Sequence, residues 1–396
     1  MKDKALPEGW NKINITKVFT QISTTGKNIA TKDCLSVGKY PVIDQGAEYI
    51  SGYFNDETKV IPVENKVIVF GDHTRNFKLI DFDFIVGADG VKIFQPAKDI
   101  DPDFFYYQCL SLNLPNKGYH RHFRYLKECD FIYPSFSQQQ KLAKKFTALL
   151  SQVAEIKQRL EKIPALLKTY RQSVLARAVN GELSAKWREE NGVSLESWAI
   201  STLKNLTTKI GSGSTPKGAE YLPEGVPFIR SLNIYTHFIK FDDLAFINDE
   251  QAQKLKNVVI EQGDLLLNIT GASIGRVNIA PKEFIGGRVN QHVAIIRSKL
   301  DKIRPHFLHI FFASPKIQKW INDENYGSTR QALTKGMLEE LKIAVPSLEE
   351  QNYITQAVEK HLNFANQLEA RVNAALERIN LMTQAILEKG FRGELL

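Results

Sequence analysis

Two short segments in the first third of the chain carry side chains of the types that contact nucleic acids. One reads HTRNFK from His73 to Lys78, and the other reads GYHRHFR from Gly118 to Arg124. Arginine, lysine and asparagine bind base edges and phosphate oxygens. We therefore treat these two clusters as the first candidates for a nucleic-acid contact. The alternative for each residue is a solvated position in a polar loop.

Further polar loops extend the candidate set into both halves of the chain. In the first half the candidates are Lys27, Asn28, His73, Thr74, Arg75, Asn76, Lys78, Tyr119, His120, Arg121, His122 and Arg124. In the second half they are Ser212, Ser214, Thr215, Lys217, Arg230, Asn233, Tyr235, Arg276, Arg288, Asn290, Gln291, Arg330 and Gln331. Lys and Arg outnumber Asp and Glu by 52 to 44, and the formal net charge of +8 favours a polyanionic partner.

Sequence motifs for catalysis or metal binding are missing, so we expect no catalytic residue, metal or cofactor in this chain. The segment GSGSTPKG at 211–218 lacks the GxxxxGK[ST] spacing of a phosphate-binding loop. No Pro-Pro dipeptide occurs, which removes the Asn/Asp-Pro-Pro-aromatic motif of amino-methyltransferases, and no acid-x-Lys pair of a nuclease follows Asp103 within reach. His306 and His309 have no acidic or cysteine partner nearby and are interpreted as ordinary helix residues.

The Met1 end has no apolar signal region, and no stretch of 18 apolar residues occurs, so we expect a cytoplasmic protein.

The elements that must position these loops are revealed by an internal repeat. A shift of 212 positions places Pro134-Ser135 on Pro346-Ser347 and Gln139 on Gln351 without a gap. The same shift places Gly181-Glu182-Leu183 on Gly393-Glu394-Leu395. A period of this length indicates a duplicated half-protein rather than a solenoid.

Inside each copy the apolar residues alternate in steps of four and three, which predicts a coiled-coil helix. The predicted seam consists of Leu142, Phe146, Leu149, Val153, Ile156, Leu160, Ile163 and Leu167 in the first copy, and Ile354, Val358, Leu368, Val372, Ile379 and Ile386 in the second. His361 interrupts the second seam, and we expect it to face outward.

Chain connectivity then predicts the direction of pairing. The first helix leads from one globular region to the other, and the second helix begins at that other region. The two seams can bury each other only by pairing antiparallel within the chain. The alternative is that each helix packs only on its own globular region.

The predicted fold is therefore α+β, with two globular α/β regions separated by two long helices that form an intramolecular antiparallel coiled coil. The predicted division is a first globular domain at 1–133, a central helix at 134–184, a second globular domain at 185–345 and a C-terminal helix at 346–396. We expect a circular repeat with approximate two-fold symmetry.

These features resemble the DNA-specificity subunits of Type I restriction-modification enzymes. The similarity rests on GSGSTPKG, GVPFIRSLNI, GDLLLNITGASIGR and NQHVAII in the second domain, and on PS-x-x-x-Q, YRQSVLARAVNGEL and MTQAILEKGFRGEL around the helices. It covers essentially the whole chain and is weakest in the first domain.

The resemblance implies a division of labour between this chain and its partners. Each globular domain would be a target recognition domain for one half of a split double-stranded DNA sequence, and the coiled coil would fix the unread spacer. The helices would bind two methyltransferase subunits, and motor-nuclease subunits would join them. S-adenosylmethionine, ATP and Mg²⁺ are expected on those partners.

Two other classes of function compete with this interpretation. A stand-alone methyltransferase-nuclease is disfavoured by the missing motifs. A non-enzymatic scaffold with two protein-binding heads is the remaining alternative, and sequence-specific, salt-dependent DNA binding would distinguish the two.

Overall fold

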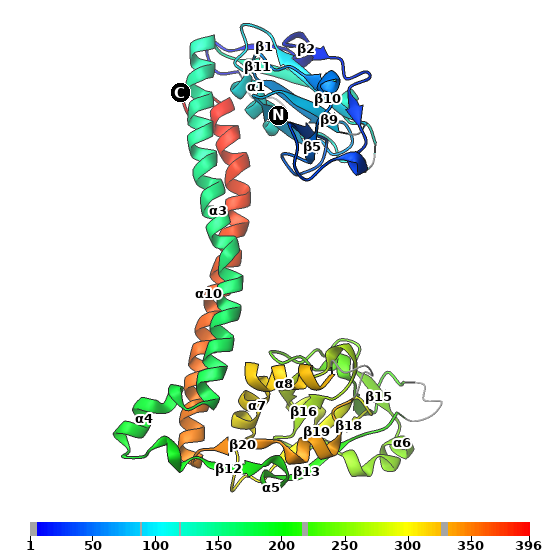
Figure 1. Cartoon of the computed structure of the whole chain (residues 1–396), viewed down its shortest axis with the longest axis vertical. Coiled ribbons are helices and arrows are strands. Elements are labelled where there is room, and N and C mark those ends of the chain that lie inside the picture. Colours follow the sequence, from blue (N-terminus) through cyan, green and yellow to red (C-terminus); the bar gives the residue numbers. More distant parts are fainter. Residues whose placement is uncertain (1–5, 88, 119, 216–220, 326–331) are drawn as a thin grey trace. The chain divides into compact units, whose positions relative to one another are not determined.

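The computed structural model describes residues 6–87, 89–118, 120–215, 221–325 and 332–396. The predicted Tyr119, Lys217, Arg330 and Gln331 lie outside these ranges. The chain divides into two compact units, one formed by 1–161 with 372–396 and the other by 162–371. We call them unit 1 and unit 2, and Figure 1 labels many of their elements.

Unit 1 contains two sheets, a short strand pair and two short helices before its first long helix. The strands β2 (Phe19–Ile22), β10 (Val91–Pro96), β7 (Val67–Gly71) and β8 (Phe77–Ile80) form an antiparallel sheet in that order. A second sheet has the order β3 (Asn28–Ile29), β9 (Phe84–Gly87), β4 (Tyr40–Ile43) and β5 (Gly52–Phe54), with β6 (Val60–Ile61) paired to β9. The strand β1 (Asn11–Asn14) pairs with β11 (Asp130–Tyr133), and the helices are α1 (Pro102–Ser111) and α2 (Phe123–Lys127).

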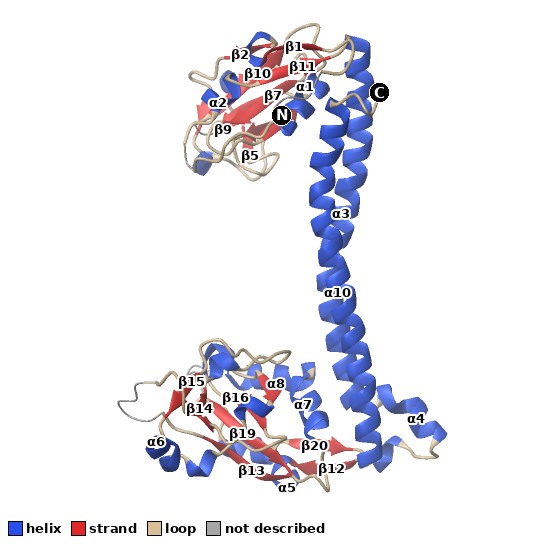
Figure 2. Ribbon diagram, turned by 180° about the vertical axis from the view of Figure 1, so that it is seen from behind, coloured by secondary structure: helices blue, strands red, loops and turns tan. Residues whose placement is uncertain are grey.

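Unit 2 also contains a four-stranded antiparallel sheet, a second sheet and a strand pair, joined by different connections. The strands β13 (Thr207–Ser212), β19 (Val293–Ser298), β16 (Leu265–Asn268) and β17 (Val277–Ile279) form the antiparallel sheet, and β15 (Ala245–Ile247), β14 (Val226–Ile229) and β18 (Arg288–Val289) form the second one. The strand β12 (Ala199–Thr202) pairs with β20 (Lys342–Val345). The short helices are α4 (Ala185–Glu190), α5 (Leu203–Leu206), α6 (Asp249–Lys254), α7 (Pro305–Ala313), α8 (Pro315–Asn325) and α9 (Lys335–Glu340). Figure 2 shows the strands of each unit in red.

The predicted α+β fold class is confirmed, and the two long helices are α3 (Phe136–Val179) and α10 (Leu348–Phe391). They pack antiparallel within each unit. In unit 1 the ring centroids of Phe146 and Phe391 lie 5.2 Å apart, and Lys145 Nζ donates to the Leu395 carbonyl oxygen at 2.6 Å. In unit 2 Arg171 forms an ion pair of 2.8 Å with Glu369. Each helix contributes to both units, so the compact units do not coincide with the four predicted segments.

Most predicted seam residues are buried or half-buried in the paired helices, with one exception. Ile156 is 49% exposed, so its assignment to the seam is corrected. A straight α-helix drifts by about 20° per heptad relative to a 3.5-residue repeat. A contact line that is fixed near the helix ends can therefore leave a mid-helix position at its edge.

The prediction for His361 was wrong, because its ring lies in the helix interface rather than facing outward. His361 is half-buried, and its Nδ1 lies 2.6 Å from the Tyr170 hydroxyl on the facing helix. A polar ring is tolerated in the seam here because the other helix supplies a hydrogen-bond partner.

Two equivalent glutamines attach the long helices to the globular parts. In unit 1 the buried Gln139 donates to the carbonyl oxygens of Asp99 and Pro134 at 3.2 and 3.1 Å, and accepts from the Asp101 backbone N–H at 3.0 Å. In unit 2 the corresponding glutamine makes the equivalent set of bonds.

That second glutamine, Gln351, donates to the carbonyl oxygens of Lys302 and Pro346 at 3.0 and 2.9 Å, and accepts from the Arg304 backbone N–H at 2.7 Å. Asp101 and Arg304 are the N-caps of α1 and α7. The PS-x-x-x-Q motif therefore fixes the start of each long helix to the start of the helix that packs beside it.

Among the described residues, no helix is both long enough and apolar enough to cross a membrane. Within the same ranges, no group of three or more histidine, cysteine or acidic side chains is placed to hold a metal ion.

Candidate nucleic-acid interface

In unit 1 the structure brings the two principal candidate clusters together through Asp72 and His122. The His122 backbone N–H donates to the Asp72 carbonyl oxygen at 2.7 Å, and the ring Nδ1 lies 3.0 Å from the same oxygen. The Phe123 backbone N–H donates to Asp72 Oδ1 at 2.7 Å. The loop after β7 and the turn before α2 thus form one surface, and Asp72 is the residue that sequence reasoning missed.

Two candidates of unit 1 must be corrected, because they are buried and hold loops together. His122 has no exposed surface. Lys78 is 5% exposed, and its Nζ donates to the carbonyl oxygens of Asp44 and Glu48 at 2.9 and 2.5 Å. Burial lowers the pKa of Lys78, although Asp44 opposes this shift.

Four other candidates of unit 1 are engaged by neighbouring backbone or side-chain groups. Thr74 Oγ1 and Asn76 Nδ2 donate to the Gln45 carbonyl oxygen at 2.6 and 3.1 Å. Lys27 Nζ donates to the Thr58 and Val60 carbonyl oxygens, and Asn28 Nδ2 donates to Asp89 Oδ1 at 3.2 Å. Gln45 also accepts from the backbone N–H of His73. These bonds shape the loops and leave fewer side chains for a ligand.

Most of the predicted contact residues that keep accessible side chains in unit 1 lie around α2. Arg121 and His120 are exposed, and within the described ranges the Arg121 side chain forms no hydrogen bond or ion pair. The Arg124 guanidinium stacks 4.5 Å from the Tyr125 ring centroid, and Lys127 Nζ lies 4.7 Å from that of Phe123. Arg75 has a φ of 66° and donates to the Leu114 carbonyl oxygen at 3.2 Å. Basic and aromatic groups therefore alternate on this surface, as on nucleic-acid-binding surfaces.

In unit 2 the GSGST segment meets the loop before β19. The Gly213 N–H donates to the Asn290 carbonyl oxygen at 3.1 Å, and Thr215 Oγ1 donates to Gln291 Oε1. A side chain at Gly213 would place Cβ 1.7 Å from the Val289 carbonyl oxygen, so only glycine fits. The exposed Ser212 and Ser214 complete a polar patch.

Several predicted contact residues of unit 2 form hydrogen bonds within unit 2 itself, so their assignment to a ligand surface is also corrected. Asn233 is fully buried, accepts from the Arg230 backbone N–H and donates to the Lys240 carbonyl oxygen. Asn290 is 6% exposed and accepts from the His292 N–H. Arg288 donates to the carbonyl oxygens of Ala252, Gly286 and Gly287. These residues stabilise turns.

Arg230, Arg276 and Tyr235 keep accessible side-chain groups in unit 2. The Arg230 guanidinium lies 4.9 Å from the Tyr221 ring centroid and donates to the Asp243 carbonyl oxygen. The Arg276 guanidinium lies 4.2 Å from the Tyr235 ring centroid. The structure thus brings the segments around 230–235 and 276 together, in addition to the GSGST contact.

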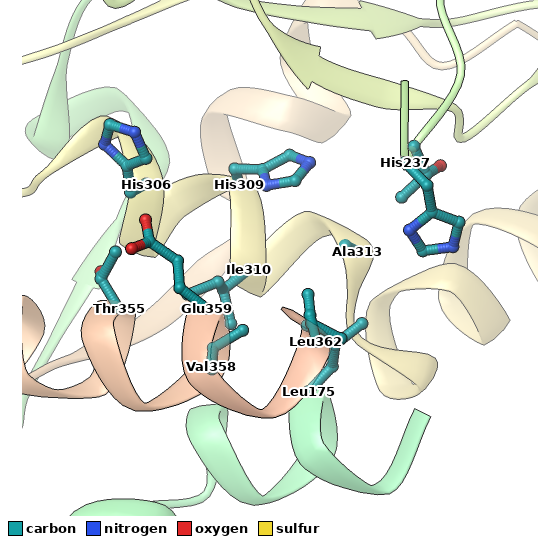
Figure 3. A pocket seen from close by; sticks show the side chains of 11 residues that line it. Leu175, His237, His306, His309, Ile310, Ala313, Thr355, Val358, Glu359 and Leu362 are labelled. Atoms are coloured by element: carbon teal, nitrogen blue, oxygen red, sulfur yellow. The ribbon is translucent and has the colours of Figure 1, made fainter. Parts of the chain in front are cut away.

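A separate cavity of about 170 Å³ lies in unit 2 between α7 and the long helices. Figure 3 shows His306, His309 and His237 around it, with Glu359 and Leu362 on α10. Its apolar wall includes Leu175. Unit 1 has a larger groove of about 550 Å³ between α1 and the long helices, lined by Tyr106, Leu110, Thr147 and Leu150 among others.

His309 makes the stability of unit 2 depend on pH. Burial lowers the pKa of His309 from 6.5 to about 4, so the folded protein holds this ring neutral. The His309 ring takes up a proton near pH 6.5 in the unfolded chain, but only near pH 4 in the folded chain. The free energy of unfolding therefore falls as the pH drops from 6.5 to 4. The wild-type protein thus loses unfolding free energy between pH 7.5 and pH 5, and we expect His309→Gln to reduce this loss by about 2 kcal/mol. Urea unfolding followed by tryptophan fluorescence measures this, and equal losses in both proteins would contradict it.

The sequence and fold of this chain can be compared with those of known proteins. The family model described as the Type I restriction modification DNA specificity domain matches residues 7–165 and 196–378. The chain therefore belongs to the family of Type I restriction-modification DNA-specificity proteins.

Individual relatives agree with this assignment. The specificity subunit of the Type I restriction enzyme EcoBI from Escherichia coli is 34% identical over 274 residues, which cover 66% of this chain and 57% of the relative. The chain thus matches little more than half the length of such relatives. A chain from a structure of the type I R-M system aligns with a TM-score of 0.71 at 18% identity, covering 99% of this chain and 100% of the other.

The HsdS subunit of Thermoanaerobacter tengcongensis aligns with a TM-score of 0.61 at 17% identity, covering 99% of each chain. At these identities the two solved structures establish the fold.

Proposed function

We propose that this chain is the DNA-specificity subunit of a Type I restriction-modification complex and that each globular part reads one half of a split target. The repeated strand plan carries the proposal: each unit has a four-stranded antiparallel sheet, a second mixed sheet and a strand pair, but the loops on them differ in length and polar residues. Two related scaffolds with different loops suit two different half-sites on one duplex. The basic-aromatic surface around α2 supports DNA as the ligand.

The proposed partners act on the long helices. Paired stretches of α3 and α10 with a pocket beside them occur in both units, which supports two copies of the same partner, and we assign these as methyltransferase subunits. Motor-nuclease subunits complete the complex. In this proposal S-adenosylmethionine, ATP and Mg²⁺ belong to those partners, and this chain acts in the cytoplasm without a catalytic residue of its own.

Single-molecule methylation sequencing of host DNA tests the proposal. The host is compared with and without this gene, in the presence of the neighbouring methyltransferase gene. A split adenine-methylated motif that disappears with this gene supports the function and reveals both half-sites and the spacer. If the methyltransferase is active and no motif depends on this gene, the scaffold with two protein-binding heads is the better interpretation.

Replacing Arg121 with alanine is expected to weaken binding to the target duplex by about 1–3 kcal/mol, the range for a bidentate base contact. The affinity of the complex for target and unrelated duplexes is measured at fixed salt. Lys141→Ala, which removes an exposed cation at the start of α3, controls for charge alone. Equal effects of the two substitutions would place Arg121 in the general electrostatic attraction rather than in base recognition.

A further inference from the structure

The connection between β14 and β15 in unit 2 differs from its counterpart in unit 1. It spans 230–244, whereas the equivalent connection between β4 and β5 spans only 44–51. Both strand pairs are antiparallel, and both β14 and β4 have a parallel neighbour on the other side. The extra length is therefore an addition of unit 2 to a shared plan, and it contains a small hairpin at 234–239.

This hairpin is held rigidly at its base. Ile234 and Ile239 form an antiparallel bridge, and the Tyr235 N–H donates to the Phe238 carbonyl oxygen at 3.1 Å. Asn278 Nδ2 donates to the Tyr235 carbonyl oxygen at 2.8 Å, which ties the hairpin to β17. The buried Ile234 anchors it in a core of unit 2. A segment with these bonds can present side chains in a fixed orientation.

The hairpin exposes an aromatic surface beside an arginine. The rings of Tyr235 and Phe238 are stacked with centroids 4.4 Å apart and an interplanar angle of 11°. Phe238 is 54% exposed, and the nearby Phe241 is 48% exposed. The Arg276 guanidinium stacks on Tyr235, and among the described residues no carboxylate pairs with it. Arg297 on β19 differs, because Asp264 and Glu261 neutralise it.

We propose that this aromatic hairpin stacks on a base in the half-site that unit 2 reads and stabilises an opened base step. Each base offers a flat π-face to a ring such as Phe238. An aromatic ring that inserts at a base step partly unstacks and kinks the duplex. The unpaired Arg276 supplies positive charge beside the rings, which suits DNA better than an uncharged protein surface.

The inference deepens the proposed function and rests on it. Adenine methylation requires the target base to leave the stack, because the reacting atom is inaccessible inside a duplex. A recognition domain that opens the adjacent step lowers the energy required for the partner to extrude that base. In the part of the chain that the structure describes, the hairpin occurs in unit 2 and not in unit 1, so its effect is confined to one half-site.

The experiment uses the complex of this chain with its methyltransferase on a duplex that carries the motif found by sequencing. The chain variants are Phe238→Ala, Phe238→Leu and Phe238→Tyr. Alanine removes the ring, leucine keeps apolar bulk without a π-face, and tyrosine keeps the ring. Tyr49→Ala in the counterpart connection of unit 1 is the control for loss of a partly exposed ring; Tyr49 is 48% exposed, and its hydroxyl donates to the Leu79 carbonyl oxygen. Methylation of each half-site and 2-aminopurine fluorescence in each half-site are measured with saturating complex.

We expect Phe238→Ala and Phe238→Leu to lower methylation and fluorescence in the unit 2 half-site by about ten-fold, as for the loss of one stacked base. Phe238→Tyr retains wild-type behaviour, and the other half-site is unchanged. The inference is overturned if Phe238→Ala leaves both half-sites unchanged, if it affects them equally, or if Phe238→Leu behaves as wild type. If the wild-type complex itself shows no methylation that depends on this chain, the proposed function fails instead.

Discussion

Replacing Glu350 with alanine is expected to lower the free energy of unfolding of unit 2 by about 3–5 kcal/mol, because it leaves a buried arginine without its counter-charge. Glu350 Oε1 accepts from Arg188 and from Ser184 Oγ, both at 2.7 Å, and Oε2 accepts from Trp198 Nε1 at 2.9 Å. The Glu350 side chain is 1% exposed and that of Arg188 is 9% exposed. One carboxylate therefore joins the start of α10 to α4 and to the segment leading into β12.

Urea unfolding of the full chain, followed by tryptophan fluorescence, measures this effect. Trp198→Phe removes the hydrogen bond to Glu350, which contributes about 1 kcal/mol, together with part of a buried ring beside Arg188. The double substitution Arg188→Met with Glu350→Leu removes both charges and is expected to be less destabilising than Glu350→Ala. A loss below 1 kcal/mol for Glu350→Ala would show that Arg188 is satisfied by Gly181 and Ser184 alone.

Deleting one heptad from each long helix is expected to change the spacer of the methylated motif while preserving both half-sites. Removing 155–161 from α3 and 373–379 from α10 takes seven residues from each partner and preserves the seven-residue repeat. At about 1.5 Å per residue the pair becomes about 10 Å shorter, which corresponds to about three base pairs of DNA. Loss of methylation through altered helical phase is also consistent with this mechanism.

Methylation sequencing of a host carrying the deletion variant measures this result. Circular dichroism and co-purification with the methyltransferase serve as controls that the shortened helices still pair. A motif with altered half-sites and the original spacer would exclude the helices as the determinant of spacing.

The helices and several strands could be predicted because their apolar patterns repeat over many residues. The seam from Leu142 to Leu167 continues for several heptads, and apolar runs at 67–71 and 293–298 form β7 and β19. The second sheet was not predicted. In unit 1 the strands β3 and β6 of this sheet have two residues each, and in unit 2 so does β18, which is too short for a periodic signal.

The candidate site was less predictable, because the same type of polar side chain can either contact a ligand or stabilise a neighbouring turn. His122 and Arg121 are adjacent in the sequence, yet the first bonds to Asp72 inside the protein and the second is exposed. Amino-acid composition does not predict this difference, because it depends on contacts between segments that are far apart in the chain. The aromatic hairpin was missed because Phe238 resembles an ordinary core residue, although its spacing from Tyr235 offered a weak signal.

The glutamine joints at Gln139 and Gln351 have a consequence for how such a protein can diversify. Each joint bonds only to main-chain atoms, namely two carbonyl oxygens and one N–H. Main-chain groups are present whatever side chains the domain carries. A globular segment with an unrelated sequence can therefore replace the existing one at the same joint without a compensating change in the helix. Under the proposed function, recombination at these positions would offer a direct route to new DNA specificities.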